Sequence, residues 1–264
     1  MVTLPHGVWI EGERHQAAEL RGPTGADEAF LLELDEASPA ARTTALLARC
    51  LVRLGPLATV PEEIARSLVL GDREALLLHV HRLFGGGRLQ CVLSCPGEAC
   101  GEPLDVELAV DDLLLPPYEH ASDVHEATFG NELIRFRLPT GADLEAAVPL
   151  AYDLQAAARL VLQRCALGPA PLTDELADEL AARLAELDPQ AELRLAVECP
   201  ACGLEFSALL DTADYLFREL GWQRESLFRE VHLLALGYHW SEADILALPA
   251  PKRRLYLELL AEAS

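Results

Sequence analysis

Two short cysteine-containing motifs are the part of this chain best suited to chemistry. One is Cys-Pro-Ala-Cys-Gly at residues 199–203. Its glycine can adopt a positive φ, so the backbone can turn beneath a metal ion and direct both thiolates toward it. Such a zinc knuckle supplies half of a tetrahedral site. The other half is expected at residues 95–101, where Cys-Pro-Gly-Glu-Ala-Cys-Gly has the same two ends and a longer spacer.

Together the two motifs predict one structural zinc ion. Its ligands would be the thiolates of Cys95, Cys100, Cys199 and Cys202. Four protein ligands leave no coordination position for water, so such an ion stabilises the fold and takes no part in catalysis. The two pairs lie much farther apart in the sequence than the roughly 15–20 residues typical of a compact zinc ribbon. The alternative is that one or both pairs are free thiols.

A repeated sequence pattern explains how such distant cysteines would meet. The pentapeptide Pro-Thr-Gly-Ala-Asp occurs at residues 23–27 and again at 139–143. Each copy follows a predicted β-hairpin and precedes an amphipathic helix that carries an Arg-Cys pair, ending in Cys50 or Cys165. Landmarks that recur in the same order are the signature of a repeated unit, so we expect an internal duplication. A pseudo-twofold relation between the two units would bring the knuckles together.

The alignment of the two units also makes predictions about other residues. The predicted strand at 191–199 aligns without gaps on residues 87–95. This alignment places Cys91 opposite Leu195 and predicts that Cys91 lies in the core and is not a metal ligand. The first unit is the longer one, and we expect its extra residues in a longer helix near 79–83 and in the glycine run that follows.

These patterns predict an α+β fold. Each unit would contain a β-hairpin, helices, a zinc-knuckle β-hairpin and a further helix, and the two units would form a pseudo-twofold, zinc-ribbon-like core followed by a C-terminal helical tail. The predicted domains are 1–122 (first repeat), 123–222 (second repeat) and 223–264 (tail). Hairpins are expected at 7–21 and 124–138, strands at 88–95, 104–108, 191–199 and 204–206, and helices at 27–35, 40–54, 71–83, 173–187, 212–220, 225–237 and 244–248, with short or final helices starting at 61 and 251.

The composition restricts the classes of function. The chain has 43 acidic and 21 basic residues and a formal net charge of −22. Binding to nucleic acids or anionic membranes depends on Lys and Arg, so neither is expected. Every apolar stretch is interrupted before it reaches the roughly 18–20 residues of a membrane span. The first residues lack the basic start and apolar core of a signal peptide, which predicts a cytoplasmic protein with reduced cysteines.

No motif in the sequence predicts an enzyme. The chain has no His-Glu-x-x-His metal motif, no phosphate-binding glycine loop and no nucleophile elbow. His79 and His81 are two positions apart on a predicted helix and face different directions, so they are not expected to share a metal ion.

The C-terminal tail is the stretch that we expect to bind a partner. Aromatic side chains dominate the binding energy of many protein interfaces, and the tail also holds the one dense basic cluster of the chain. The predicted partner-binding residues are Tyr238, Trp240, Lys252, Arg253, Arg254 and Tyr256. The alternative is a terminal helical hairpin that packs on the core and binds nothing.

The tail carries a resemblance to a known family. Residues 238–249, Tyr-His-Trp-Ser-Glu-Ala-Asp-Ile-Leu-Ala-Leu-Pro, with 230–235 before them and Arg-Arg-Leu-Tyr-Leu at 253–257 after them, resemble baseplate-hub assembly proteins of T-even-type contractile phages and related extracellular contractile injection systems. The Pro-Thr-Gly-Ala-Asp turns and the knuckles look like those of longer, zinc-knuckle members of this group. The chain departs from the group at residues 95–100, where the spacer exceeds two residues.

The resemblance implies a non-enzymatic assembly chaperone or a minor structural component of the baseplate of a phage-tail-like particle. Its partners would be baseplate hub, spike or tail-tube proteins. It would act in the cytoplasm of a bacterial or phage-infected cell, or be retained in the assembled particle. The alternative function is a zinc-ribbon protein–protein adaptor or regulator unrelated to phage tails.

Overall fold

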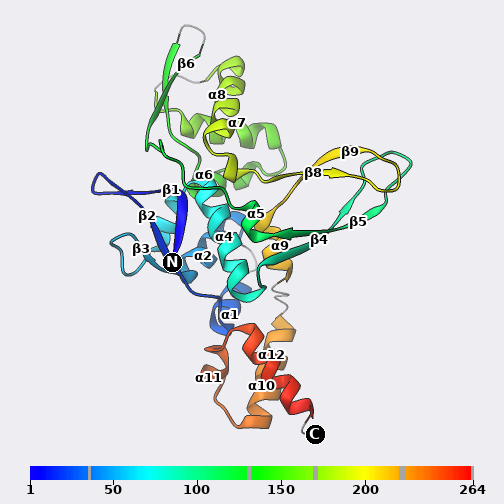
Figure 1. Cartoon of the computed structure of the whole chain (residues 1–264). Coiled ribbons are helices and arrows are strands. Elements are labelled where there is room, and N and C mark those ends of the chain that lie inside the picture. Colours follow the sequence, from blue (N-terminus) through cyan, green and yellow to red (C-terminus); the bar gives the residue numbers. More distant parts are fainter. Residues whose placement is uncertain (35–36, 130–131, 169–171, 220–223, 263–264) are drawn as a thin grey trace.

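The computed structural model describes residues 1–34, 37–129, 132–168, 172–219 and 224–262. They form a mixed α+β fold with small antiparallel sheets (Figure 1), as the sequence predicts. The strands are β1 (Val2–Ile10), β2 (Glu13–Leu20), β3 (Leu51–Leu54), β4 (Arg88–Ser94), β5 (Pro103–Ala109), β6 (His125–Phe129), β7 (Glu132–Phe136), β8 (Arg194–Glu198) and β9 (Glu205–Leu209). The helices are α1 (Gly25–Glu33), α2 (Pro39–Cys50), α3 (Glu62–Ser67), α4 (Leu70–Phe84), α5 (Val110–Leu113), α6 (Gly141–Ala147), η1 (Val148–Leu150), α7 (Leu154–Cys165), α8 (Asp174–Leu187), η2 (Pro189–Ala191), α9 (Thr212–Glu219), α10 (Arg224–Tyr238), α11 (Glu242–Leu246) and α12 (Ala250–Glu262).

The largest core lies beneath the three-stranded sheet β1-β2-β3. Buried leucines of α2 and α4, among them Leu46, Leu47 and Leu76, pack against Leu4 of β1. Leu216 of α9 joins the same cluster, although α9 follows the second hairpin pair in the sequence. The first part of the chain therefore does not complete its own core, because a helix of the second part fills it.

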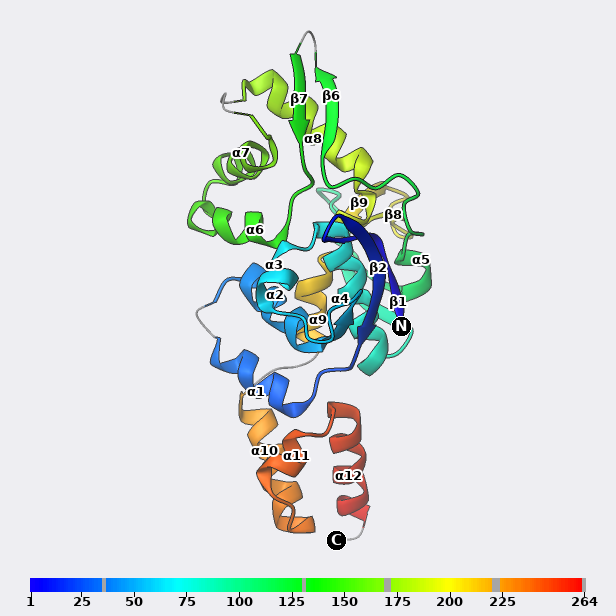
Figure 2. The ribbon, with the colours of Figure 1, turned by 90° about the vertical axis from the view of Figure 1, so that its left-hand side faces the viewer.

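A second core lies under the β6–β7 hairpin at the upper end of the molecule in Figure 2. Phe136 is fully buried there and packs with Cys165 of α7 and Leu180 of α8. The two cores share one plan, in which a hairpin covers helices and the cysteine of the Arg-Cys pair, Cys50 or Cys165, is buried.

The extra length of the first unit does not lie where the sequence suggested. Helices α4 and α8 have 15 and 14 residues, so the expectation of a longer helix near residues 79–83 is wrong. Instead, β3 and α3 lie between α2 and α4, whereas the described residues between α7 and α8 form neither a helix nor a strand. The predicted helix 40–54 ends early at Cys50 because the next four residues pair with β2. A local apolar pattern does not reveal such non-local pairing.

Each Pro-Thr-Gly-Ala-Asp turn begins a helix, and its aspartate is buried between two arginines. Thr24 and Asp27 form a capping box at the start of α1. The Asp27 carboxylate also accepts hydrogen bonds from Arg21, at 2.5 and 3.0 Å, and from the Nε–H of Arg49 at 2.7 Å. Burial alone would raise the pKa of Asp27, but the two arginines and the Thr24 N–H lower it to about 2.

The second copy of the turn is built in the same way. Thr140 and Asp143 form the capping box of α6. Arg137 donates to Asp143 at 2.6 and 2.9 Å, and the Nε–H of Arg164 donates at 2.7 Å. Asp143 is 0% exposed, and although burial opposes ionisation, these donors hold its pKa well below its usual range. Both turns are thus fixed by one carboxylate and two guanidinium groups.

A buried polar contact joins the two parts of the chain. The N–H of Gly71, in the first turn of α4, donates to Asp188 Oδ2 at 2.8 Å. His6 Nε2 lies 3.1 Å from Asp188 Oδ1, and the Asp72 carboxylate accepts from the N–H groups of His6 and Gly7, each at 2.8 Å. A Cβ at residue 71 would collide with the Asp188 carboxylate, so only glycine fits there.

The described residues contain no helix that combines the length and apolar character needed to cross a membrane.

The buried aspartates predict a specific acid sensitivity. The Asp27→Asn variant should lose about 2 kcal/mol of unfolding free energy at pH 7, because the ionised carboxylate is stabilised by roughly two pKa units. A lowered pKa contributes its full stability above the unfolded value of 3.8 and loses it as the pH falls toward about 2. The difference between variant and wild type should therefore shrink over this window.

Urea unfolding followed by circular dichroism at pH 7, 4 and 3 measures this difference. The exposed Asp178 on α8 provides the control, since Asp178→Asn should change stability by less than about 0.5 kcal/mol. A difference for Asp27→Asn that stays constant from pH 7 to pH 3 would show that the charge is not what matters.

Candidate metal centre

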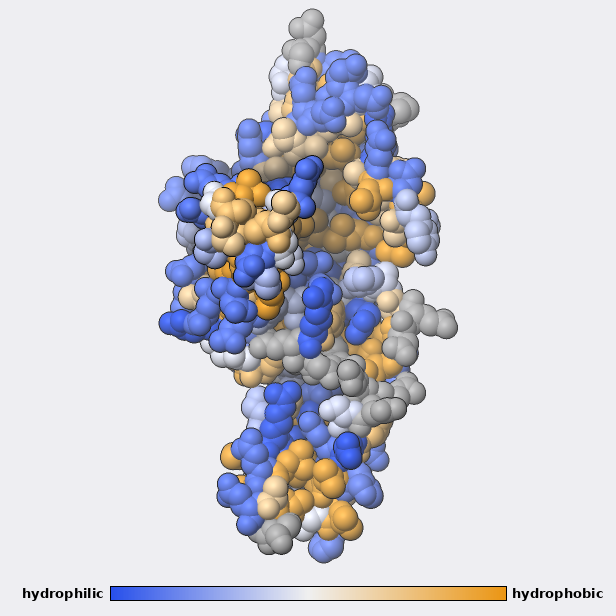
Figure 3. Space-filling view, turned by 90° about the vertical axis from the view of Figure 1, so that its right-hand side faces the viewer, coloured by the Kyte–Doolittle hydropathy of each residue, from blue (hydrophilic) through white to orange (hydrophobic). Residues whose placement is uncertain are grey.

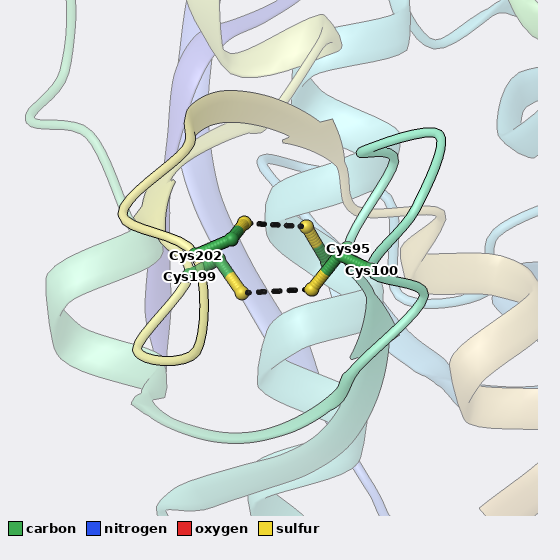
Figure 4. Close-up of side chains that lie close together, drawn as sticks. All are labelled: Cys95, Cys100, Cys199 and Cys202. Atoms are coloured by element: carbon green, nitrogen blue, oxygen red, sulfur yellow. Dashed lines mark hydrogen bonds between the residues drawn. The ribbon is translucent and has the colours of Figure 1, made fainter.

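The hairpins β4–β5 and β8–β9 extend side by side and meet at their tips (Figures 1 and 4). Cys95 Sγ lies 3.6 Å from Cys202 Sγ, and Cys100 Sγ lies 3.7 Å from Cys199 Sγ. All four sulfurs lie within 4.8 Å of one another. In a tetrahedron with metal–sulfur bonds of about 2.3 Å, neighbouring sulfurs are about 3.8 Å apart. The structure therefore confirms that these four cysteines come together in an arrangement that can hold a metal ion.

The backbone of the two tips follows one pattern. The N–H of Cys95 donates to the carbonyl of Glu102, and the N–H of Cys199 donates to that of Leu204, both at 2.9 Å. A glycine with positive φ follows each second cysteine, with φ of 63° at Gly101 and 72° at Gly203. A side chain at these positions would strain the turn that directs the thiols inward.

The longer spacer of the first tip does not spoil this geometry. The N–H of Cys100 donates to the carbonyl of Gly97 at 2.9 Å, which closes the extra residues into a turn of their own. The Gly97 N–H also points at Cys95 Sγ, at 3.5 Å. The two extra residues between Cys95 and Cys100 are accommodated within this turn. The sulfurs of both cysteines still face the second hairpin (Figure 4).

A small apolar cluster surrounds the inner side of the site. Cys95 and Cys199 are buried against Leu104, Val197 and Phe206. Cys202 lies on the exposed side. Each of these hairpins is an isolated two-stranded ribbon, and such ribbons are marginally stable in water on their own. The contact at the tips therefore helps to hold the two ribbons in a fixed position relative to each other.

The electrostatics of the site suit metal binding. Burial raises the pKa of Cys199, but the N–H groups of Cys202 and Ala201 lower it to about 7. The Gly97 N–H lowers the pKa of Cys95, but lost hydration and the neighbouring thiols raise it to about 12. One thiolate thus forms readily, and a divalent cation would remove the cost of ionising the others. Four thiolates suit zinc or iron and leave no open position for a substrate.

The remaining cysteines lie elsewhere. Cys91 is half-buried on β4 and does not belong to the cluster. Cys50 and Cys165 are fully buried, and burial raises the pKa of each to about 12. Among the described residues, these four cysteines are the one group of three or more His, Cys, Asp or Glu side chains placed to share a metal ion.

The three aromatic residues expected to bind a partner contact one another. The rings of Tyr238 and Trp240 stack at 4.8 Å, and Tyr256 meets Trp240 edge-on at 4.9 Å. The Tyr238 hydroxyl donates to the Tyr256 carbonyl at 3.1 Å. These side chains thus hold α10, α11 and α12 together and are only partly accessible.

Arg253 does not lie on an exposed basic surface, so this part of the prediction is wrong. The side chain is 1% exposed and its fork binds two carboxylates: Nη2 lies 2.8 Å from Glu28 Oε2, and Nε lies 2.8 Å from Glu230 Oε2. Its Nη1 donates to the Leu248 carbonyl at 2.8 Å. Its neighbours Lys252 and Arg254 are exposed.

Both Pro-Thr-Gly-Ala-Asp turns contact an arginine of another segment in the same way. Gly25 donates to the carbonyl of Leu248, and a Cβ there would come within 2.9 Å of Arg253 Nη1. Gly141 donates to the carbonyl of Leu68, and a Cβ there would collide with the guanidinium of Arg73. The arginine follows the acceptor leucine by five residues in both cases. The same Leu-to-Arg spacing also occurs at 77/82, 83/88 and 154/159, so it does not by itself identify this contact from the sequence.

Comparison of the chain with protein-family models, curated proteins and solved structures finds no match.

The Arg253 contacts predict a large loss of stability on substitution. Arg253→Gln should cost about 3 kcal/mol at pH 7, because it leaves Glu28 buried without a cation. Burial already raises the pKa of Glu28 above its usual range, despite Arg253. The cost of a raised carboxyl pKa is full above the folded-state pKa and disappears as the pH falls toward the unfolded value of 4.5, so the defect should be much smaller at pH 4 than at pH 7.

Thermal and urea unfolding at pH 7 and pH 4 test this expectation. The adjacent Arg254→Gln removes the same charge from an exposed position and should change stability by less than about 0.5 kcal/mol. Equal effects of the two substitutions would contradict the role given to the buried ion pair.

Proposed function

We propose that the four cysteines hold one structural zinc ion and that the two hairpin-bearing parts of the chain are copies of one duplicated unit. Support for zinc comes from sulfur separations close to those of a tetrahedral thiolate site, and zinc requires no redox partner. Support for duplication comes from the matched tips and from the two aspartates, Asp27 and Asp143, that each bind two arginines through the same atoms.

We further propose that the protein is a non-enzymatic assembly chaperone or minor component of the baseplate of a contractile, phage-tail-like particle. The resemblance of residues 230–257 to baseplate-hub assembly proteins supports this function. The observation that carries it in the structure is an apolar surface on the C-terminal helices. Leu233 and Leu236 of α10 and Leu255 and Leu259 of α12 are 40–66% exposed, although each helix buries other residues in their shared core.

This surface replaces the aromatic residues as the proposed binding element. Tyr238, Trp240 and Tyr256 pack against one another inside the helical unit, whereas the four leucines are exposed on its surface. Exposed Lys252 and Arg254 provide basic contacts at the start of α12. A partner such as a hub, spike or tail-tube protein would cover the leucines during assembly.

A zinc-ribbon adaptor or regulator unrelated to tails is the second candidate. The closed four-thiol site is compatible with both functions, because it stabilises a fold and leaves no place for a substrate. The two candidates differ in whether a particle depends on the protein.

The zinc proposal predicts about one zinc ion per chain in protein purified without chelators. Cys95→Ser and Cys199→Ser should each abolish zinc binding and lower the thermal midpoint by similar amounts, since they would remove ligands from one shared ion. Cys91→Ser changes a cysteine of the same hairpin outside the cluster and should retain the metal. Metal analysis by mass spectrometry measures all three variants, and the zinc proposal is falsified if the wild-type protein contains none.

The assembly proposal predicts that Leu236→Glu with Leu259→Glu prevents particle formation in the cells that produce the protein. Both residues are exposed, so purified variant protein should melt within a few degrees of wild type. Leu133→Glu, at an equally exposed residue of β7, is the control and should leave particles normal. Sedimentation and electron microscopy of cell extracts measure particle yield.

Normal particles from the double variant would contradict docking through this surface. Normal particles after deletion of the whole gene would favour the adaptor function. Mass spectrometry of purified wild-type particles separates a retained component from a chaperone that leaves.

A further inference from the structure

A second apolar surface lies between the two parts of the chain. It is a groove of about 490 Å³ whose walls come from α2 and α4 on one side and from α6, η1 and the β9–α9 segment on the other. Figure 3 shows a hollow with an apolar floor at this level of the molecule, beside the projecting hairpins. The volume lies within the roughly 300–1,000 Å³ of sites that bury a ligand.

The apolar lining continues onto the surface beyond the groove. Leu144, Val148 and Leu209 line it and are 38–56% exposed, so the groove carries an exposed apolar patch. Two further apolar residues that follow η1 in the sequence, Tyr152 and Leu154, are more exposed still. An open groove lined by exposed apolar side chains fits the apolar face of a peptide segment better than it fits a compact small molecule.

The charged groups of the groove are mainly acidic. Glu74, Glu192 and Asp211 line it, and neither Glu74 nor Asp211 forms an ion pair within the described part of the chain. Glu192 is bonded to Arg194 at 3.0 Å. The other arginine, Arg73, is almost fully buried and donates to the carbonyls of Ala65 and Ala40.

Glu74 is the group that a cation would help most. It lines the groove from α4, and burial raises its pKa to about 7, although Thr212 and Arg73 oppose this shift. A basic side chain placed beside it would stabilise the ionised form and would also meet the Asp211 carboxylate at the rim. A second copy of this chain is a poor occupant, because two molecules of charge −22 repel each other.

We propose that this groove binds an amphipathic, basic segment of a partner protein, with apolar side chains between Val148 and Leu209 and a Lys or Arg facing Glu74 and Asp211. The site is separate from the leucines of α10 and α12, and it does not depend on a particle. It would serve an assembly chaperone and an adaptor equally.

Fluorescence anisotropy with a labelled synthetic peptide of about 14 residues tests this proposal on the full-length protein. The peptide has Leu on one helical face and Lys on the other, and its control is a scrambled peptide of the same composition, which keeps the charge and loses the apolar face. We expect the amphipathic peptide to bind at least about tenfold more tightly than the scrambled one. Equal binding of the two would mean non-specific attraction to an acidic protein and would overturn the proposal.

Two double variants locate the site. Val148→Glu with Leu209→Glu should weaken binding by about tenfold or more, even though the added charge attracts the peptide. Val92→Glu with Leu133→Glu adds the same charge at exposed apolar residues outside the groove lining and should not weaken binding. Unchanged binding by the groove variant, or equal weakening by both, would overturn the proposal.

A third variant tests the chemistry of the partner. Glu74→Gln with Asp211→Asn removes two charges and keeps an acceptor at residue 211 for the Asp214 N–H that caps α9. This variant should bind the Leu/Lys peptide more weakly than the wild-type protein does, and it should bind a Leu/Gln peptide of the same pattern as tightly as the wild type. Equal effects on both peptides would show that these carboxylates do not select a basic segment.

Discussion

Arginine side chains that reach buried carboxylates hold this chain together. All but one of its 21 basic residues are arginines, and the acidic residues, 43 in number, outnumber them about two to one. Asp27 and Asp143 each form ion pairs with two arginines, and Arg253 forms ion pairs with both Glu28 and Glu230. A planar guanidinium with several fixed donors can satisfy two buried acceptors at once, which a lysine cannot do in the same geometry. With 43 acids against 21 bases, the chain as a whole is strongly acidic.

The same interaction determines how the parts of the chain dock. At both Pro-Thr-Gly-Ala-Asp turns the glycine lies against an arginine of a different segment, Arg253 at Gly25 and Arg73 at Gly141. The glycine is required at both positions because a Cβ would displace the guanidinium. The C-terminal helices are thus anchored on α1, and they are not a loosely attached tail. A second contact of the same kind joins α4 to α6. Any partner of the C-terminal helices must bind their outer face.

Some of this was predictable from the sequence, and the reasons are physical. The cysteine spacings and the glycines after them have local consequences, and the repeated pattern paired the two motifs, so the four-thiol cluster could be predicted from residue order. The burial of Arg253 did not, because its partner Glu28 lies 225 positions away and the basic run around it is typical of a solvated surface. Strand β3 was missed for a similar reason, since its pairing with β2 is invisible in an apolar pattern that continues from α2.

The groove depends on contacts that lie outside it. One wall belongs to β9 and the segment that leads into α9, and β9 is half of a two-stranded ribbon with little stability of its own. The cysteines at the tip of this ribbon attach it to the neighbouring ribbon, while Arg73 and Asp188 fix the opposite walls through Gly141 and Gly71. A metal at the tips would therefore act on binding indirectly, by holding Leu209 at a fixed distance from Val148. Under either proposed function, a metal in the closed four-thiol site would then contribute to partner binding without touching the partner.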